Sequence, residues 1–129
     1  MAFEKPHLML SLEANADLST KQFRFCEIVA AGKVDVCNAA TDKPVGVLQN
    51  APKAGETAEL LVVGISKVDS DAALSRGDLI GTSADGQADA KTPGTDTTEY
   101  VVGMVIEASG AAGGKATALI NCASPHRAA

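Results

Sequence analysis

Apolar and polar residues alternate in short runs along the chain, and Gly, Pro, Asp or Asn separates one run from the next. Leu8, Leu10 and Leu12 alternate with Met9, Ser11 and Glu13, so one face of that segment is apolar. Apolar residues at helical spacing are not sustained anywhere. The pattern therefore predicts an all-β fold with strands at 7–13, 23–29, 34–38, 45–49, 58–68, 78–82, 100–107 and 115–121, and leaves 72–76 as the one segment with room for a single helical turn.

Two stretches of the chain match each other in order, which indicates an internal repeat. Val45-Gly46-Val47 matches Val102-Gly103-Met104, Ala54-Gly55 matches Ala112-Gly113, and Leu61-Val62 matches Leu119-Ile120, at offsets of 57 or 58 residues. Upstream, residues 27–29 with Gly32 match residues 78–80 with Gly86. Glycine inside a strand marks a bulge or a close backbone approach, and glycine in a turn supplies a positive φ.

The repeat divides the chain into three parts. We expect an N-terminal arm at residues 1–20, a single β domain at 21–123 built from halves 21–65 and 66–123, and a C-terminal tail at 124–129. The segment 84–99 has no large apolar residue and the composition of a solvated surface loop. Pro125 cannot continue a central strand, which favours a tail after it.

Composition indicates a subunit with a small core. Of the 129 residues 23 are Ala, Leu, Ile, Val and Phe together number only 29, and there is no Trp and one Tyr. Such a chain cannot fill a deep core or build an aromatic ligand pocket. We therefore expect a subunit that shares apolar surface with neighbouring copies.

Charge and cysteine content exclude several classes of protein. Sixteen acidic against eleven basic residues give a net charge of −5, which disfavours binding to a phosphate backbone. No apolar run is long enough to cross a bilayer and the start lacks a signal-peptide pattern, so we expect a protein made in the cytoplasm without a membrane partner. Three cysteines, Cys26, Cys37 and Cys122, form no C-x-x-C pair, so we expect free, buried thiols and no metal site.

The sequence offers little to catalysis. His7 and His126 lie near opposite ends of the chain without a partner motif, and no phosphate-cradling glycine loop occurs. We expect no enzyme activity and no cofactor. Two alternatives stay open: a lipoyl- or biotinyl-type carrier domain modified at Lys67, and an adhesive surface module that exposes Arg76-Gly77-Asp78, although the same tripeptide suits a turn that enters a strand.

Several short segments, in order along most of the chain, resemble the capsid cement or head-decoration proteins of tailed phages. They are residues 16–19 (ADLS), 22–25 (QFRF), 44–50 (PVGVLQN), 54–56 (AGE), 63–68 (VGISKV), 77–79 (GDL), 85–86 (DG), 102–103 (VG) and 125–128 (PHRA). Each is loose alone, and the resemblance lies in their order. The three cysteines and the long 84–99 loop depart from the family's pattern.

The resemblance implies a small β-sandwich or β-barrel-like domain of the lambda-type decoration fold. It also implies a homotrimer on the outer capsid surface of the virion, at local three-fold positions, where it clamps subunits of the major capsid protein and stabilises the shell. Within this frame we expect the arm to contact the capsid or a neighbouring subunit through Phe3, Leu8, Leu10 and Leu12, because leaving these side chains in water costs about 1.5 kcal/mol or more each. We expect the arm to add as an edge strand to another chain.

Overall fold

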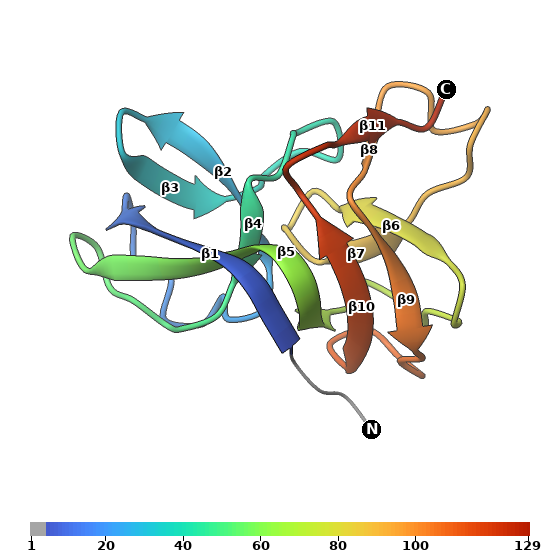
Figure 1. The fold of residues 1–129 in the computed structure, drawn as a ribbon, viewed down its shortest axis with the longest axis horizontal. Coiled ribbons are helices and arrows are strands. Elements are labelled where there is room, and N and C mark those ends of the chain that lie inside the picture. The colour runs from blue at the N-terminus through green and yellow to red at the C-terminus, as the bar shows by residue number, and fades with distance from the viewer. Residues whose placement is uncertain (1–4) are drawn as a thin grey trace.

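The longest strand, β5 (Thr57–Asp69), runs through the middle of the molecule and is paired on both sides. In the computed structural model, which describes residues 5–129, it lies antiparallel to β1 (Lys5–Ala14) and β4 (Gly46–Leu48) along its first part. Along its second part it lies antiparallel to β10 (Lys115–Asn121). Figure 1 shows β1, β2 and β3 on one side of the molecule and β6, β7, β9 and β10 on the other.

The first half is a closed ring of five strands. Its members follow the order β1, β3 (Lys33–Val36), β2 (Phe25–Ala30), β4 and β5, and the pairing of β1 with β5 closes the ring. Small and medium apolar side chains fill its interior: Ala14, Leu18, Cys26, Val34, Leu48, Ala58 and Leu60.

The second half repeats this ring with β5 as its first strand. The order continues from β5 through β10, β9 (Gly103–Glu107) and β6 (Leu79–Thr82) to β7 (Ala88–Ala90), and a parallel bridge between Ala88 and Ser70 returns to the end of β5. Two short strands, β8 (Tyr100–Val101) and β11 (His126–Arg127), form a separate ribbon.

Backbone hydrogen bonds of the two halves match pair by pair. The N–H groups of Asn15, Leu18 and Cys37 donate to the carbonyls of Val34, Pro52 and Phe25, and those of Asp71, Leu74 and Lys91 donate to the carbonyls of Ala88, Ser109 and Leu79. The equivalence places β1 of the first half on β5 of the second. β5 therefore serves as the last strand of one half and the first strand of the other.

Glycines at the matched strand positions explain the most visible part of the repeat. A Cβ on Gly46 would lie 3.0 Å from the Leu61 carbonyl oxygen, and a Cβ on Gly103 would lie 2.6 Å from that of Leu119. Both glycines therefore let a short strand approach the last strand of its half closely.

The all-β prediction is confirmed, and the structure gives a more detailed account of three local segments. Residues 72–76 form no helical turn, and Leu74 within them makes an antiparallel bridge to Ser109. Within 84–99, β7 pairs with β6, and the Lys91 side chain is fully buried between Asp89 and Glu99. Within 124–129, β11 pairs with β8 and Ala128 is buried, because Pro125 only precedes this strand.

No helix among residues 5–129 is suited to span a membrane.

Addition of the arm as a strand to another chain stays a prediction, but residues 5–14 already form a strand that is paired within their own chain. This segment is β1, and its main chain is paired with β5 from Lys5 to Glu13 and with β3 at Glu13 and Ala14. The arm has a counterpart before the second half, namely β5, and among the described residues the edge of β1 that faces away from β5 is paired only at Glu13 and Ala14. The boundaries predicted at residues 20, 65 and 123 stay a prediction, and β5 continues across the middle one.

Candidate functional site

Large apolar side chains are exposed in three places on the described surface. Exposed apolar patches commonly mark sites of protein–protein contact. The first place is β1, the second is the end of β2 that leads into the turn before β3, and the third is the outer face of β9 and β10. Their members are Leu8 and Met9, Ile28 and Val29, and Met104, Ile106 and Leu119, respectively.

Leu8 lies at an irregularity in β1. The register with β5 shifts on both sides of Leu8, between Pro6 and Leu8 and between Leu8 and Met9, and the Leu8 side chain is 48% exposed. Its main chain is opposite Val63, so the strand stays paired while the side chain faces solvent. Leu8 is therefore available to a partner protein.

The other members of the predicted contact set differ from Leu8. Leu10 and Leu12 are partly buried and pack against the apolar interior of their own chain. Phe3 lies outside the described residues. The predicted contact role of all four residues stays a prediction, and Leu8 is the one whose side chain is mostly free of the chain's own core.

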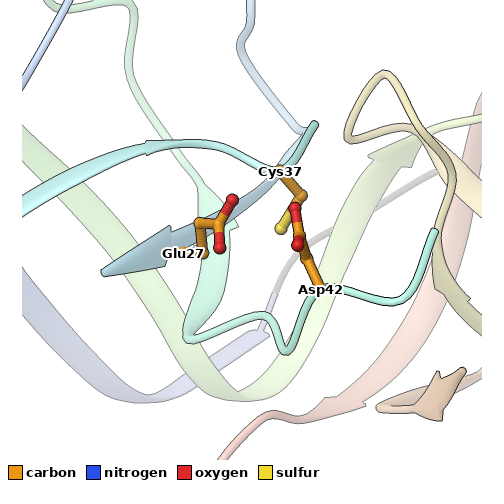
Figure 2. Close-up of side chains that lie close together, drawn as sticks. All are labelled: Glu27, Cys37 and Asp42. Carbon is orange, nitrogen blue, oxygen red and sulfur yellow. The ribbon is translucent and has the colours of Figure 1, made fainter. Parts of the chain in front are cut away.

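Glu27, Cys37 and Asp42 lie close together beside β2. Figure 2 shows the three side chains pointing toward one another from β2, from the end of β3 and from the following loop. One ligand atom of each lies within 4.8 Å of the others. Asp42 also accepts hydrogen bonds from the backbone N–H groups of Asn38 (2.9 Å) and Ala39 (3.0 Å), which closes the loop after β3.

The electrostatic environment of this cluster favours the protonated forms of Glu27 and Cys37. Burial, a hydrogen bond to the Asp42 side chain and the negative charges of Asp42 and Asp35 raise the pKa of Glu27 to about 7, although a backbone hydrogen bond at Asn38 lowers it. Burial likewise raises the pKa of the Cys37 thiol well above its ordinary value. A cation at this place would have to displace a proton from the thiol. The geometry explains how the loop is held and supports no catalytic step.

The prediction of free, buried thiols is confirmed. Cys26, Cys37 and Cys122 are all buried and unpaired with one another. Burial raises the pKa of Cys26 to about 12 and that of Cys122 to about 12. These thiols pack as small apolar side chains.

The structure disfavours both alternative sites. Lys67 lies inside β5 opposite Thr117, with its ammonium group 5.6 Å from the centre of the Phe23 ring, and not at the exposed hairpin tip that a carrier lysine requires. In the Arg76-Gly77-Asp78 tripeptide, Gly77 has a φ of 88° and the Asp78 carboxylate accepts the Ser75 N–H at 2.9 Å. The tripeptide is thus a turn that enters β6.

Sequence reasoning missed two of the three exposed apolar places. The run Met104-Val105-Ile106 is apolar on both faces of its strand, which was the available signal for an outer face in need of cover. Ile28 and Val29 gave a similar signal, since the apolar run continues to the turn. The Glu27, Cys37 and Asp42 cluster carried no recognisable spacing.

Comparison with known proteins gives a family and a fold. A family model described as phage cement protein matches residues 10–121. No curated protein matches the chain. Among solved structures, the crystal structure of head fiber gp8.5 N base in bacteriophage phi29 is similar, with a TM-score of 0.67 and 17% identity over 89% of this chain and 94% of that chain. At this identity the likeness shows the fold alone.

Proposed function

Because the chain belongs to the phage cement protein family, and is therefore a capsid-associated structural protein, we propose that it binds the outer surface of the assembled shell and stabilises it. We propose further that it binds the major capsid protein as a homotrimer at local three-fold positions. The observation that carries the proposal is the family match over residues 10–121.

The mechanism is mass action. A protein that binds the assembled shell and not its separated subunits stabilises the shell by RT ln(1 + [L]/Kd) at each site. At a free protein concentration of 100 times Kd, binding therefore stabilises the shell by about 2.7 kcal/mol per site. Many equivalent sites on one shell let modest contacts resist internal pressure together. This role asks for apolar and polar surface and for no catalytic group.

Together with Phe3, five positions earlier in the sequence, Leu8 is the residue that we propose as an anchor on the capsid. Its side chain is exposed and its backbone is held by β5, so binding costs little ordering of the strand. Leu10 and Leu12 support the strand from within. In this proposal Leu8 and Phe3 contact the capsid, and Leu10 and Leu12 hold β1, and with it Leu8, in place.

Co-sedimentation with purified capsids tests the proposal. We expect saturable binding to expanded shells and none to soluble major capsid protein. Leu8→Asp should weaken binding at least tenfold, whereas Thr20→Asp, a charge placed at another exposed position, should not. No binding of the wild-type chain to expanded shells of its own phage would overturn the proposed function. Equal binding by Leu8→Asp would overturn the anchor only.

A further inference from the structure

The two halves of the chain differ in what covers the outer faces of their rings. In the first half, one residue from each of four neighbouring strands forms a row across the sheet: Phe25, Val47, Leu61 and Met9. In the second half the equivalent row is Leu79, Met104, Leu119 and Ile65, paired in the same order. We call them the covered row and the open row.

The covered row is buried inside this chain. Phe25, Val47 and Leu61 are fully buried and belong to the same apolar cluster as the interior of the second half, while Met9 lies at the margin. In the open row, Met104 is 44% and Leu119 52% exposed. A hollow of about 230 Å³ lies over it, lined by Leu79, Met104 and Leu119 among others. The equivalent outer faces of the two halves therefore differ, because the row in the first half is covered and the row in the second half is exposed.

The turn between β6 and β7, residues 82–86, lies against the covered half. The Phe25 N–H donates to the Gly86 carbonyl at 2.7 Å, and Arg24 donates to the Asp85 carbonyl at 3.2 Å. A Cβ on Gly86 would lie 2.3 Å from Val36 Cγ2. This docked turn buries Thr82 and Ser83 almost completely.

The equivalent turn of the first half, residues 28–32, has no such cover. Ile28 is 57% and Val29 44% exposed, and apart from its own neighbours no residue in the described part of the chain lies within 4 Å of the place where a Cβ on Gly32 would be. This free turn is more apolar than the docked one, since Ile28 and Val29 replace Thr82 and Ser83 and alanines follow them. One end of the chain thus carries an uncovered turn and the other an uncovered row.

From this pairing we propose that a second copy of the chain inserts its free turn, residues 28–32, against the open row of Leu79, Met104, Leu119 and Ile65. Within one copy, residues 82–86 of the second half reach Arg24, Phe25 and Val36 of the first half, and the proposed contact joins a first half to a second half in the same way between copies. The contact between copies does not match the contact within one copy residue for residue, because the two halves of one chain share β5 whereas two copies share no strand. The turn and the row are different surfaces, so the contact is heterologous, and copies related by a three-fold rotation would close it into a ring.

The occupant follows from the chain itself. An uncovered turn and an uncovered row on one molecule are the two different surfaces that a head-to-tail interface needs, whereas a foreign partner would give no reason for both to be open. The proposal gives the homotrimer an interface and in that respect rests on the proposed function. It assigns the β2–β3 turn and the β9–β10 face to subunit contact, and leaves the exposed edge of β1 for the capsid.

Charge substitution in each surface, followed by mixing, tests the inference without any capsid present. Val29→Asp damages the turn and leaves the row, and Met104→Asp damages the row and leaves the turn. In sedimentation velocity at tens of micromolar we expect the wild type to be a ring, each variant to be a monomer, and an equimolar mixture of the two to form a dimer that grows no further. Thr98→Asp, at an exposed loop position, should keep the wild-type mass.

Several outcomes contradict the inference. A monomeric wild type, variants that keep the assembled mass, or folded variants whose mixture stays monomeric would each overturn it. If an aspartate variant loses its cooperative thermal melt and therefore does not fold, the milder variants Val29→Ser and Met104→Ser replace the aspartate pair in the same experiment. Since the measurement involves no capsid protein, its failure leaves capsid binding intact, and failure of capsid binding leaves the ring intact.

Discussion

Phe23 has the same left-handed backbone conformation as Gly77, its equivalent in the second half. The φ angles are 67° and 88°, and Phe23 is the one non-glycine residue with positive φ in the described chain. Each N–H donates a hydrogen bond of 2.7 Å, Phe23 to the Leu48 carbonyl and Gly77 to that of Val105. The turn that enters β2 and β6 therefore requires this conformation, whichever residue occupies it.

Replacing Gly77 with Ala should destabilise the fold through the backbone alone. Nothing lies within 4 Å of the added Cβ, so the cost is that of the left-handed conformation, about 1–2 kcal/mol. Gly110→Ala is the matched control, because Gly110 has equal space and no positive φ. Chemical denaturation measures both. Equal free energies of unfolding for the two variants would contradict this explanation.

Lys91 ties the 84–99 segment to the rest of the second half. Its ammonium group donates to the Thr82 carbonyl at 2.9 Å and pairs with Asp89 at 3.2 Å and with Glu99. Lys91→Met leaves the Glu99 carboxylate without this partner and should cost about 3–5 kcal/mol. The double variant Lys91→Met with Glu99→Gln should recover part of that loss in urea denaturation. A double variant less stable than Lys91→Met would argue against the buried pair as the cause.

Glu27 should make the folded state less stable as the pH rises. Its pKa is raised from 4.5 to about 7, so between these values the folded state binds more protons than the unfolded state. The contribution of Glu27 to the free energy of unfolding is therefore greatest below about pH 4.5. It falls as the pH rises toward 7 and changes little at higher pH. Glu27→Gln should flatten the profile between pH 5 and 8 and be more stable than the wild type at pH 8.

The control for the pH profile is Glu13→Gln, which alters an exposed carboxylate on β1. It should retain the wild-type slope between pH 5 and 8. Thermal melts at closely spaced pH values measure all three proteins. A wild-type slope in Glu27→Gln would assign the pH dependence to another group.

The three thiols should be unreactive in the native protein. Burial removes them from reagent and raises the pKa of Cys26 and Cys122 to about 12. With iodoacetamide at pH 8 and mass detection, we expect no adduct under native conditions and three adducts in denaturant without reductant. Rapid native labelling of any one cysteine, or fewer than three adducts after unfolding, would contradict the structure of this core.

Much of the fold could be predicted from the sequence because the internal repeat can be recognised there. Gly46 and Gly103 mark equivalent close approaches, and Gly55 and Gly113 occupy turns with φ of 84° and 77°. The strand β7 was missed because its residues, Ala88 to Ala90, have little intrinsic strand preference and pair only through tertiary context. An alanine-rich chain offers few side chains large enough to mark which face is buried.

The arm shows the limit of the pattern most clearly. Alternating leucines correctly indicated a strand with an apolar face, but its partner, β5, lies about fifty residues away and gives no local signal. The match of Asn15-Ala16-Asp17-Leu18-Ser19 with Asp71-Ala72-Ala73-Leu74-Ser75 extends the repeat upstream and identifies β1 with β5. The open row and free turn became visible only when the halves were compared in three dimensions.

The central claim is that this chain strengthens an assembled phage shell, and the disruption temperature of that shell tests it most directly. Expanded empty capsids stripped of the protein would be titrated with it and heated, with light scattering or electron microscopy to follow disassembly. We expect the disruption temperature to rise with occupancy and to level off when the sites are full. A disruption temperature that does not change while the protein is bound at saturation would contradict the account.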